Sequence, residues 1–316
     1  MQGDGREPHT RERVNRMEVH GLPDRHAGAL AIGASPAASG DRPYGRSVPT
    51  AGATSPDGAS PRPMPPRRRA NAVMFHIGRS GSTVLADLLA QHADCFWSGE
   101  IYERAFQTLE RQGMPLQPGA VPLDPMQFLS HVMSRADKPI YGFELKFYHL
   151  QLFGVALEDF LSLLDALEFR HFVVLERRNP LRKIVSSLVA QQKNKYRQPS
   201  GEQASLTRVR LDVDALHVDR TTGPLVGFLQ TYQERFRRLD QLLAGRSVLR
   251  LTYEDDIEPD PRIGYRRACE FLGIAPQPVD VRLGKSNPFP LAEILLNCTE
   301  VQQALSGTPF AWMLDE

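Results

Sequence analysis

The sequence predicts an α/β fold in which a mostly parallel sheet is covered by helices on both faces. Short apolar runs alternate along the chain with segments of helical periodicity. The first apolar run is followed by a glycine-containing loop and then by a helix, which is how an α/β unit opens. The 316 residues, 41% of them hydrophobic, are enough for one large domain with a substantial core. Strands that alternate with helices favour parallel order.

The first unit begins with the apolar run at 72–77, which suits a strand buried on both faces. The small-residue loop 78–82 follows it. The next segment, 83–90, has the apolar spacing of a helix.

Two further units follow the same pattern. A strand is expected at 140–147, with an amphipathic helix at 157–167 after it. A third strand at 171–175 leads into a helix at 181–192, and Pro180 fits the first turn of that helix.

The last third of the chain predicts a long loop and one more strand between two helices. Residues 193–214 are polar and aperiodic, as in a loop. Apolar positions repeat on one helical face over 225–243, and Gly245 is typical of the end of a helix. A strand at 248–252 and a helix at 265–272 complete the pattern.

The first 70 residues differ from the rest in composition. They hold ten prolines, nine glycines and no Lys, Phe or Trp, and eleven arginines against seven acidic residues give them a charge of +4. Because such a segment buries little apolar surface, we expect a disordered Pro/Gly/Arg-rich extension over 1–70 and a folded domain over 71–316. It could instead tether the protein to an anionic surface, be a dispensable tail, or precede an internal start at Met17 or Met64.

Composition also excludes several classes of protein. The net charge of +1 gives no reason to expect a nucleic-acid partner. No run approaches the apolar length of a transmembrane segment, and no secretory signal is visible. Three widely spaced cysteines predict neither a disulfide framework nor a zinc site, which favours a cytoplasmic protein without a metal. A homodimer is compatible with the sequence.

The loop between the first strand and its helix has the composition of an anion site. Successive backbone amides at a helix N-terminus attract phosphate, and Gly78 and Gly81 let the backbone approach closely. Arg79 adds a permanent charge. The candidate ligand-binding residues of this loop are Gly78, Arg79, Ser80, Gly81, Ser82 and Thr83. An ordinary glycine turn is the alternative. A Walker loop would need lysine directly before the hydroxyl residue, so a P-loop kinase is disfavoured.

A second candidate site lies at the junction after the third strand. Arg178 stands at its start, and Ser186 follows eight residues later, about two helical turns into the next helix. A serine at such a position is often only a helical residue. Two anion sites at neighbouring strand ends would nevertheless suit one ligand with phosphates at both ends.

The segments HIGRSGSTVLADLL (76–89) and VVLERRNPLRKIVSSLVA (173–190) resemble the signature of sulfotransferases that use 3′-phosphoadenosine-5′-phosphosulfate (PAPS). The resemblance extends over 71–316 and implies a P-loop-like three-layer fold. It implies that the first loop binds the 5′-phosphosulfate and that Arg178 and Ser186 bind the 3′-phosphate. It also implies an adenine contact by Tyr253, from Tyr-Glu-Asp, and a role for Lys285 in the basic C-terminal loop.

The chain looks most similar to the bacterial carbohydrate branch of that family, which includes trehalose and nodulation-factor sulfotransferases. The residues that carry this likeness are Arg-Ser-Gly-Ser-Thr, Ser98-Gly-Glu100 and Ser186 to Ala190. It departs from the cytosolic aromatic-alcohol enzymes, which have lysine in the first loop and a histidine base. Their C-terminal Arg-Lys-Gly is Gly284-Lys285-Ser286 here, which weakens the assignment of Lys285.

The resemblance implies sulfuryl transfer from PAPS to a hydroxyl of a carbohydrate or glycoconjugate, with 3′-phosphoadenosine-5′-phosphate (PAP) as product and no metal. We expect Arg79 to stabilise the leaving phosphate and Glu100 to act as the base. Glu100 could instead be a surface residue, and His92 and His149 are alternative bases. Lys146 could reach the sulfonate or lie at an exposed strand end.

We expect residues 101–140 and 193–222 to line the acceptor site. Two other functions stay open at this point: a P-loop kinase, and a catalytically silent nucleotide-binding module with the same fold.

Overall fold

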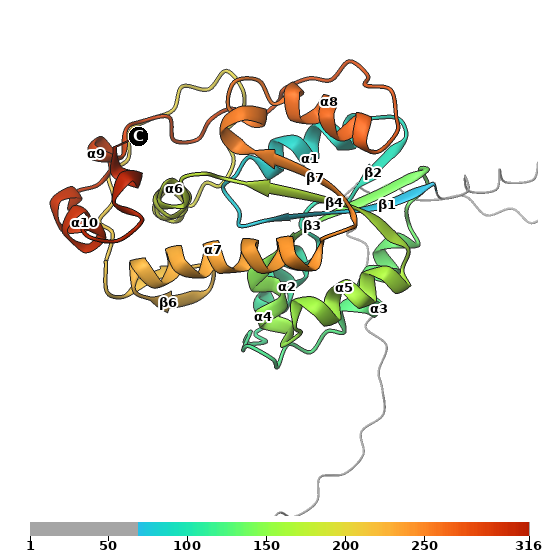
Figure 1. Ribbon diagram of the computed structural model, residues 1–316, viewed down its shortest axis with the longest axis horizontal. Helices are drawn as coiled ribbons and strands as arrows, with labels where there is room; N and C mark the ends of the chain where they lie inside the picture. The colour runs from blue at the N-terminus through green and yellow to red at the C-terminus, as the bar shows by residue number, and fades with distance from the viewer. Residues whose placement is uncertain (1–68, 316) are drawn as a thin grey trace, which may run out of the picture. The chain divides into compact units, whose positions relative to one another are not determined.

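The computed structural model describes residues 69–315, so the expected extension over 1–70 lies almost wholly outside the described residues. The described chain contains one five-stranded sheet in the order β2-β3-β1-β4-β7 (Figure 1). All four pairings between neighbouring strands are parallel. Its strands are β1 (Ala70–His76), β2 (Cys95–Trp97), β3 (Ile140–Lys146), β4 (Phe169–Glu176) and β7 (Ser247–Thr252). The predicted α/β fold with a mostly parallel sheet is confirmed.

Helices cover both faces of this sheet. In Figure 1, α1 (Ser82–Gln91) and α8 (Arg262–Phe271) lie on one side of it. The other side carries α2 (Ile101–Arg111), α4 (Phe147–Phe153), α5 (Leu157–Ala166) and α7 (Leu225–Leu242). The remaining helices are α3 (Pro125–Met133), α6 (Pro180–Lys193), α9 (Leu291–Ile294) and α10 (Cys298–Leu305), with a π-helix at Tyr253–Ile257 and a 3₁₀ turn at Ala311–Leu314. Within 69–315, no helix combines the length and apolarity needed to cross a membrane.

The central strand β1 explains why the sheet is buried on both sides. Its side chains alternate between two cores: Ala72 and Met74 pack with α1 and α8, whereas Val73 and Phe75 join the larger core on the opposite face. All four are fully buried. A continuous apolar run is what such a strand requires, and this run gave the prediction at 72–77.

Each helix and strand predicted from the sequence is present, with ends that shift by up to three residues. The segment 194–215 has no helix or named strand, as expected of the predicted loop. The sequence analysis missed β2, α2, α3, α4, the C-terminal helices and a hairpin of β5 (Leu216–Val218) and β6 (Thr221–Gly223). Most of these elements are short, so their apolar periodicity is too brief to detect.

The path of the chain after β2 determines where Glu100 lies. Gly142 of β3 has room for no side chain, because a Cβ there would overlap the ring of Trp97. Beyond β2 the chain continues along β3: Ser98 N–H donates to the Gly142 carbonyl (2.7 Å), and Glu144 N–H donates to that of Gly99 (3.0 Å). Glu100 is therefore carried to the carboxyl end of the sheet, where it is the N-cap residue of α2.

Candidate active site at the carboxyl edge of the sheet

The glycine loop after β1 leaves the start of α1 without a side-chain cap. Gly78 and Gly81 have φ angles of 78° and 80°, in the left-handed region that favours glycine. Gly81 is also the N-cap residue of α1, and it has no side chain to accept from the first-turn amides. A Cβ on Gly81 would lie 2.5 Å from Ile257 Cγ2. This loop therefore presents helix amides whose usual partner, a capping side chain, is missing, which is the arrangement that binds anions.

Arg79 reaches away from these amides and joins three distant segments. Its Nε donates to Ser186 Oγ (3.0 Å), one terminal nitrogen donates to the Tyr196 carbonyl (2.7 Å), and the other donates to Ser286 Oγ (2.6 Å). Its own carbonyl accepts from Arg177 (2.8 Å). The structure thus brings the predicted residues Arg79 and Ser186 together, with the guanidinium turned toward α6.

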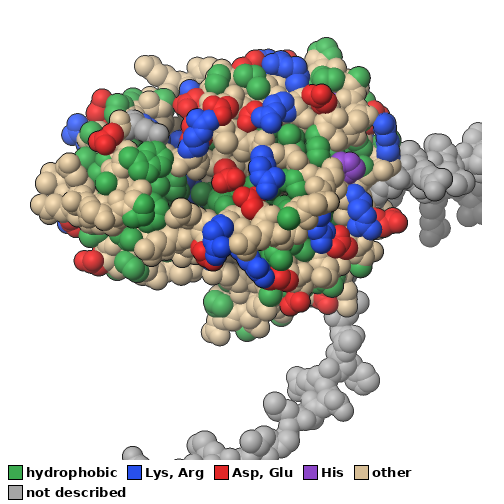
Figure 2. Space-filling model, in the orientation of Figure 1, with side chains coloured by type: hydrophobic (Ala, Val, Ile, Leu, Met, Phe, Trp, Pro, Cys, Tyr) green, Lys and Arg blue, Asp and Glu red, His purple; other side chains and the backbone are tan. Residues whose placement is uncertain are grey.

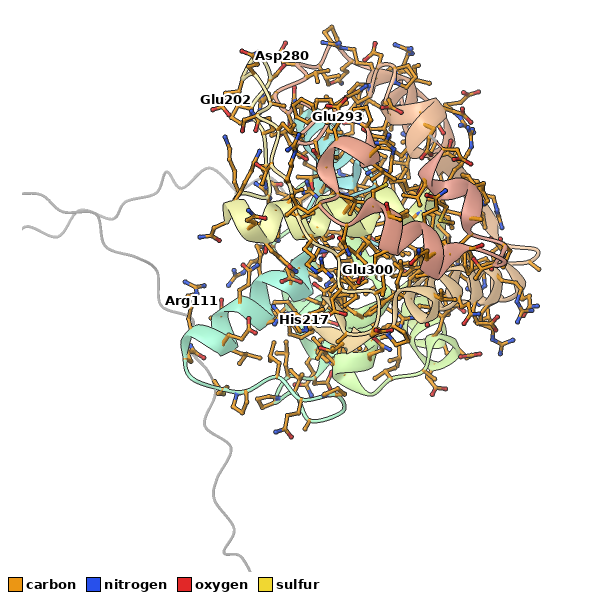
Figure 3. All side chains as sticks on the ribbon, turned by 90° about the vertical axis from the view of Figure 1, so that its left-hand side faces the viewer. Arg111, Glu202, His217, Asp280, Glu293 and Glu300 are labelled. Atoms are coloured by element: carbon orange, nitrogen blue, oxygen red, sulfur yellow. The ribbon has the colours of Figure 1, made fainter. Side chains whose placement is uncertain are left out.

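A small pocket lies beside this guanidinium. Its lining is mostly polar and basic, and consists of Arg79, Ser186, Val189, Ala190, Lys193, Lys195, Gln198 and Ser286. Two loops enclose it: Gly284 N–H donates to the Gln198 carbonyl (2.9 Å), and Ser200 N–H donates to that of Arg282 (2.8 Å). Three cationic side chains and two hydroxyls are suited to a phosphate. In Figure 3, Glu202 and Asp280, which come from the chain near these two loops, lie at the same edge of the molecule.

Arg178 lies outside this pocket lining and is engaged elsewhere. Its guanidinium donates to Asp255, its backbone N–H donates to Glu254 (3.1 Å), and half of its side chain is exposed. The N-terminus of α6 is capped by Asn179, whose Oδ1 accepts from Arg182 N–H (3.2 Å). Ser186 lines the pocket and accepts from Arg79, whereas Arg178 is paired with Asp255. The loop between β4 and α6 therefore differs from the glycine loop after β1, because the backbone N–H groups of Arg178 and Arg182 already donate to protein side chains.

Tyr253 contacts the glycine loop, whereas Lys285 pairs with a residue just beyond the π-helix that begins at Tyr253. The ring of Tyr253 lies 4.3 Å from the Arg177 guanidinium and packs against Gly81. Burial raises the pKa of Tyr253. Lys285 forms an ion pair with Glu258 (3.2 Å) and is about half exposed. Its neighbour Ser286 is the residue of this C-terminal loop that contacts Arg79.

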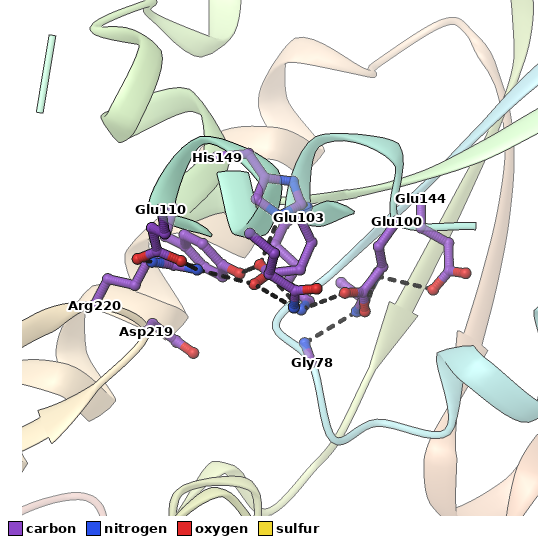
Figure 4. Close-up of polar contacts among 12 residues, drawn as sticks. Gly78, Glu100, Glu103, Glu110, Glu144, His149, Asp219 and Arg220 are labelled. Atoms are coloured by element: carbon purple, nitrogen blue, oxygen red, sulfur yellow. Dashed lines mark hydrogen bonds and ion pairs between the residues drawn. The ribbon is translucent and has the colours of Figure 1, made fainter. Parts of the chain in front are cut away.

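A chain of alternating charges lies beside the glycine loop, near Gly78 (Figure 4). Lys146 Nζ, at the end of β3, is 2.6 Å from Glu100 Oε2 and 4.0 Å from Glu103 Oε2. The stem of Lys146 packs close to Gly78. Glu103 also faces His149 Nε2 (3.6 Å) and accepts from Arg220 (3.1 Å) and from Tyr148. The predicted base and the lysine at the strand end therefore meet beside the glycine loop.

These charges shift one another's pKa values. Burial by itself would raise the pKa of Glu100, but Lys146 and His76 lower it below its usual value. Burial disfavours the ammonium of Lys146, yet Glu100 and Glu103 raise its pKa. The pKa of Glu103 falls to about 2 despite burial, because His149 and Lys146 stabilise its carboxylate. At neutral pH the site holds an ionised carboxylate and an ammonium in contact.

The hairpin β5–β6 fastens the two helices at the edge of this cluster. Its tip residues, Asp219 and Arg220, both have positive φ angles, 50° and 62°. Asp219 accepts from Lys183 Nζ of α6 (2.6 Å), and Arg220 pairs with Glu103 and Glu110 of α2. The hairpin thus links α6 to α2 near Lys146. It brings together parts of 101–140 and 193–222, the two ranges predicted to line the acceptor site.

His76, the last residue of β1, faces two carboxylates. Its ring is fully buried, and its Nδ1 accepts from Gly78 N–H (3.0 Å). Its Nε2 lies 3.2 Å from Glu144 Oε2 and 4.0 Å from Glu100 Oε1. The sequence analysis assigned no role to His76, Glu103 or Glu144. The one signal was the presence of charged residues within the buried strand at 140–147.

His76, Glu100 and Glu144 also have the composition of a metal site, since one ligand atom from each lies within 4.8 Å of the others. The hydrogen bond from Gly78 argues against that use. An imidazole nitrogen that accepts cannot carry the proton, so in the neutral ring Nε2 carries it and has no lone pair for a cation. The absence of a metal remains a prediction.

The two histidines considered as alternative bases lie in different surroundings. His92 is buried, with Nε2 2.9 Å from the Ala275 carbonyl and Nδ1 accepting from Asp94 N–H (3.0 Å). Both of its ring nitrogens are therefore used by the backbone. His149 is inside the charged cluster, and burial lowers its pKa to about 4.

No protein-family model matches the chain, and no curated protein matches it in sequence. Among solved structures, the chain is similar to the sulfotransferase domain from the curacin biosynthetic pathway, with 14% identity and a TM-score of 0.40 over 72% of this chain and 83% of that one. It is also similar to the sulfotransferase domain from the Synechococcus PCC 7002 olefin synthase, with 18% identity and a TM-score of 0.30 over 68% of this chain and 79% of that one. The fold is defined by the strand order and register given above.

The lowered pKa of His149 predicts a dependence of stability on pH. The folded protein binds this proton near pH 4 and the unfolded chain near pH 6.5, so the stabilising contribution is complete above pH 6.5 and is lost as the pH falls toward 4. We expect wild type to lose about 2 kcal/mol more unfolding free energy between pH 7 and pH 5 than His149→Asn, which cannot titrate. Urea unfolding at the two pH values measures this difference. The exposed His131, replaced by Asn, is the control and should behave as wild type. Equal losses in wild type and His149→Asn would contradict the assignment.

Proposed function

We propose that the protein transfers a sulfuryl group from PAPS to a hydroxyl acceptor. One observation carries the proposal: the Glu100 carboxylate and the Lys146 ammonium meet 2.6 Å apart beside a glycine loop whose helix amides have no side-chain cap. Sulfuryl transfer needs a group that takes the hydroxyl proton and a cation that offsets the charge developing on the leaving phosphate. The charged cluster offers both at one place.

The residues around the glycine loop fit a donor with two phosphate-containing ends. The amides of Ser82 and Thr83, with Gly78, Ser80 and Gly81, would hold the 5′-phosphosulfate. The hydroxyl of Ser80 is fully buried and has no hydrogen-bond partner among residues 69–315, which supports a ligand contact there. A bound donor supplies the activated sulfuryl group.

The basic pocket beside Arg79 is suited to the 3′-phosphate. Ser186 lines it, and Lys193 and Lys195 add positive charge. Arg178 would join this phosphate by exchanging its surface ion pair with Asp255 for a phosphate contact. Such an exchange costs little, because water screens exposed ion pairs and they contribute little to stability. Tyr253 would stack against the adenine, and Lys285 would approach from the C-terminal loop.

In the transfer step, Glu100 takes the proton of the acceptor hydroxyl. The acceptor oxygen forms a bond to sulfur while the bond between sulfur and the phosphate oxygen breaks, and the electron pair stays on the phosphate. Lys146 turns from Glu100 toward that developing charge, and Arg79 adds to the positive potential. Because Lys146 lowers the pKa of Glu100, its departure makes the carboxylate a stronger base at the moment when a base is needed.

For the acceptor we propose a carbohydrate or glycoconjugate. The support is the polar character of the surroundings of Glu100, where Glu103 and Arg220 are partly exposed next to Lys146. Carboxylate and guanidinium groups can hydrogen-bond several hydroxyls of one sugar. On the face drawn in Figure 2, basic side chains are interspersed with acidic ones.

A P-loop kinase and a silent nucleotide-binding module are the competing functions. The loop has Gly81 directly before Ser82 and Thr83, without the lysine that a kinase of this type requires. Incubation of the full chain with ³⁵S-labelled PAPS or γ-labelled ATP, each with and without Mg²⁺, and with a panel of sugars, glycolipids and phenols, separates the three. We expect sulfate transfer without Mg²⁺. Phosphate transfer that depends on Mg²⁺, or binding of PAP without turnover, would favour the alternatives.

Replacement of the base tests the mechanism. We expect Glu100→Gln to lower kcat by about 10²- to 10⁴-fold, because the amide keeps the shape of the side chain but cannot accept the proton. Steady-state kinetics with PAPS and the best acceptor measure the effect. Glu158→Gln, a replacement of an exposed glutamate on α5, is the matched control and should keep wild-type turnover. Near-normal turnover of a folded Glu100→Gln protein would remove Glu100 from this role.

Arg178→Ala tests the 3′-phosphate contact. The loss of a charge-assisted hydrogen bond of about 1.5–3 kcal/mol should raise the dissociation constant of PAP by about 10- to 150-fold. Calorimetric titration of PAP into wild type and variant gives the comparison. Arg170→Ala removes an exposed arginine near the start of β4, the strand after whose other end Arg178 lies, and should bind PAP normally. An unchanged affinity in Arg178→Ala would mean that the 3′-phosphate lies elsewhere.

A further inference from the structure

His76 and Glu144 are buried polar residues to which the transfer step gives no task. His76 is fully buried and Glu144 is 2% exposed. Their facing atoms, Nε2 and Oε2, lie 3.2 Å apart, yet neither completes a hydrogen bond within the described part of the chain. A buried hydrogen-bond donor without a partner lowers the stability of the folded protein by about 1–3 kcal/mol, so the burial of His76 calls for an explanation.

The protonation of the ring follows from its other nitrogen. Gly78 N–H points at Nδ1 from 3.0 Å, and only a nitrogen lone pair can accept that hydrogen bond. The proton of the neutral ring is therefore on Nε2, on the side of Glu144 and Glu100. Nδ1 of the imidazole thus accepts a hydrogen bond from the backbone of the glycine loop, and Nε2–H faces the carboxylate of Glu100, the proposed base.

The distance from this N–H to Glu100 matches a movement that the transfer step requires. With Lys146 on Oε2, the other oxygen of Glu100, Oε1, lies 4.0 Å from His76 Nε2. When Lys146 turns away, Glu100 loses its nearest cation. A shift of the Glu100 carboxylate by about 1 Å would bring Oε1 into hydrogen-bond range of His76 Nε2–H.

We propose that His76 is a positioning residue that links the glycine loop to the base. It holds Gly78 N–H through Nδ1, and through Nε2–H it receives Glu100 when Lys146 leaves for the donor. Glu144 lies buried beside the ring on this side, with Oε2 3.2 Å from Nε2. The inference rests on the proposed function for the movement of Lys146, whereas the state of the imidazole in the resting protein does not depend on it.

Several charged or titratable groups surround Glu100. They come from every element packed around it: His76 from β1, Glu144 and Lys146 from β3, His149 from α4, Glu103 from α2 and Arg79 from the glycine loop. A substitution of His76 therefore removes one of the groups around Glu100 and leaves the others in place.

The first experiment reads the imidazole directly and needs no activity. Long-range ¹H–¹⁵N spectra of the ¹⁵N-histidine-labelled full chain identify which ring nitrogen carries the proton, and His76→Asn assigns the signal. We expect His76 to be neutral at pH 7, with its proton on Nε2 and a pyridine-type Nδ1. A proton on Nδ1, or a doubly protonated ring, would overturn the proposal, even if the protein transfers sulfate.

The second experiment separates the two contacts with a pair of variants. His76→Asn places an amide oxygen near the Nδ1 position and so keeps an acceptor for Gly78 N–H, but it removes the donor that faces Glu100. His76→Gln reaches toward the Nε2 position with an amide N–H, but it loses the acceptor for Gly78. His92→Asn is the matched control for replacing a buried histidine and should keep wild-type kinetics.

We expect His76→Asn to bind PAP within about 2-fold of wild type and to lower kcat about 10-fold. The acidic limb of its kcat profile should move to higher pH by about one unit, because a carboxylate that loses a hydrogen-bond donor has a higher pKa. We expect His76→Gln to weaken PAP binding about 10-fold and to leave that limb in place.

Equal losses of kcat in both variants, with no movement of the acidic limb and no difference in PAP affinity, would reduce His76 to a structural residue and overturn the proposal. If wild type transfers no sulfate, the proposed function fails and the spectra still decide the state of His76. If wild type is active and the spectra show a proton on Nδ1, only the role of His76 fails.

Discussion

The parallel pairing of β1 with β3 is the constraint on which the rest of the site depends. The two strands pair residue by residue from Ala70 with Ile140 to His76 with Lys146, so the histidine and the lysine end side by side. A one-residue slip would turn each side chain of β3 to the opposite face and separate Lys146 from Glu100. Buried side chains on both faces of β1 hold this register, because a slip would move each side chain into the opposite core, where the neighbours are packed around a different residue. The core of the sheet therefore determines the geometry of the charges at its edge.

These charges are stable because opposite signs alternate through space. Lys146 separates Glu100 from Glu103, and Arg220 lies between Glu103 and Glu110. Lys183, almost fully buried, has Asp219 and the Tyr232 hydroxyl as partners. Removal of one member from such a buried set leaves another charge without its counterion, which is far more costly than the loss of a surface pair. The same dense arrangement makes the ionisation of Glu100 sensitive to any movement of Lys146.

The sequence was informative where structure is set by neighbouring residues. The apolar run at 72–77, the glycine loop and the helix after it depend on local periodicity, and each was predicted with its order correct. The return of Glu100 toward the loop could also be anticipated, since few residues separate it from α1. The engagement of Arg178 could not, because Asp255 is 77 residues away and belongs to a π-helix with no simple sequence pattern. In the sequence, His76 is only a residue near the end of a predicted strand. Its contact with Glu144 arises from the pairing of β1 with β3, which the sequence does not reveal.

Arg79 gives the pocket a particular place in the order of folding. The three groups that its guanidinium contacts, Ser186, Tyr196 and Ser286, are 107, 117 and 207 residues further along the chain. Closing loops of such length costs conformational entropy before any contact compensates for it, so contacts of this kind form after local ones. The sheet around β1, β3 and β4 can assemble without residue 286, whereas the pocket beside Arg79 cannot. The small pocket beside Arg79 is therefore a late product of folding, and during synthesis it exists only after residue 286 has left the ribosome.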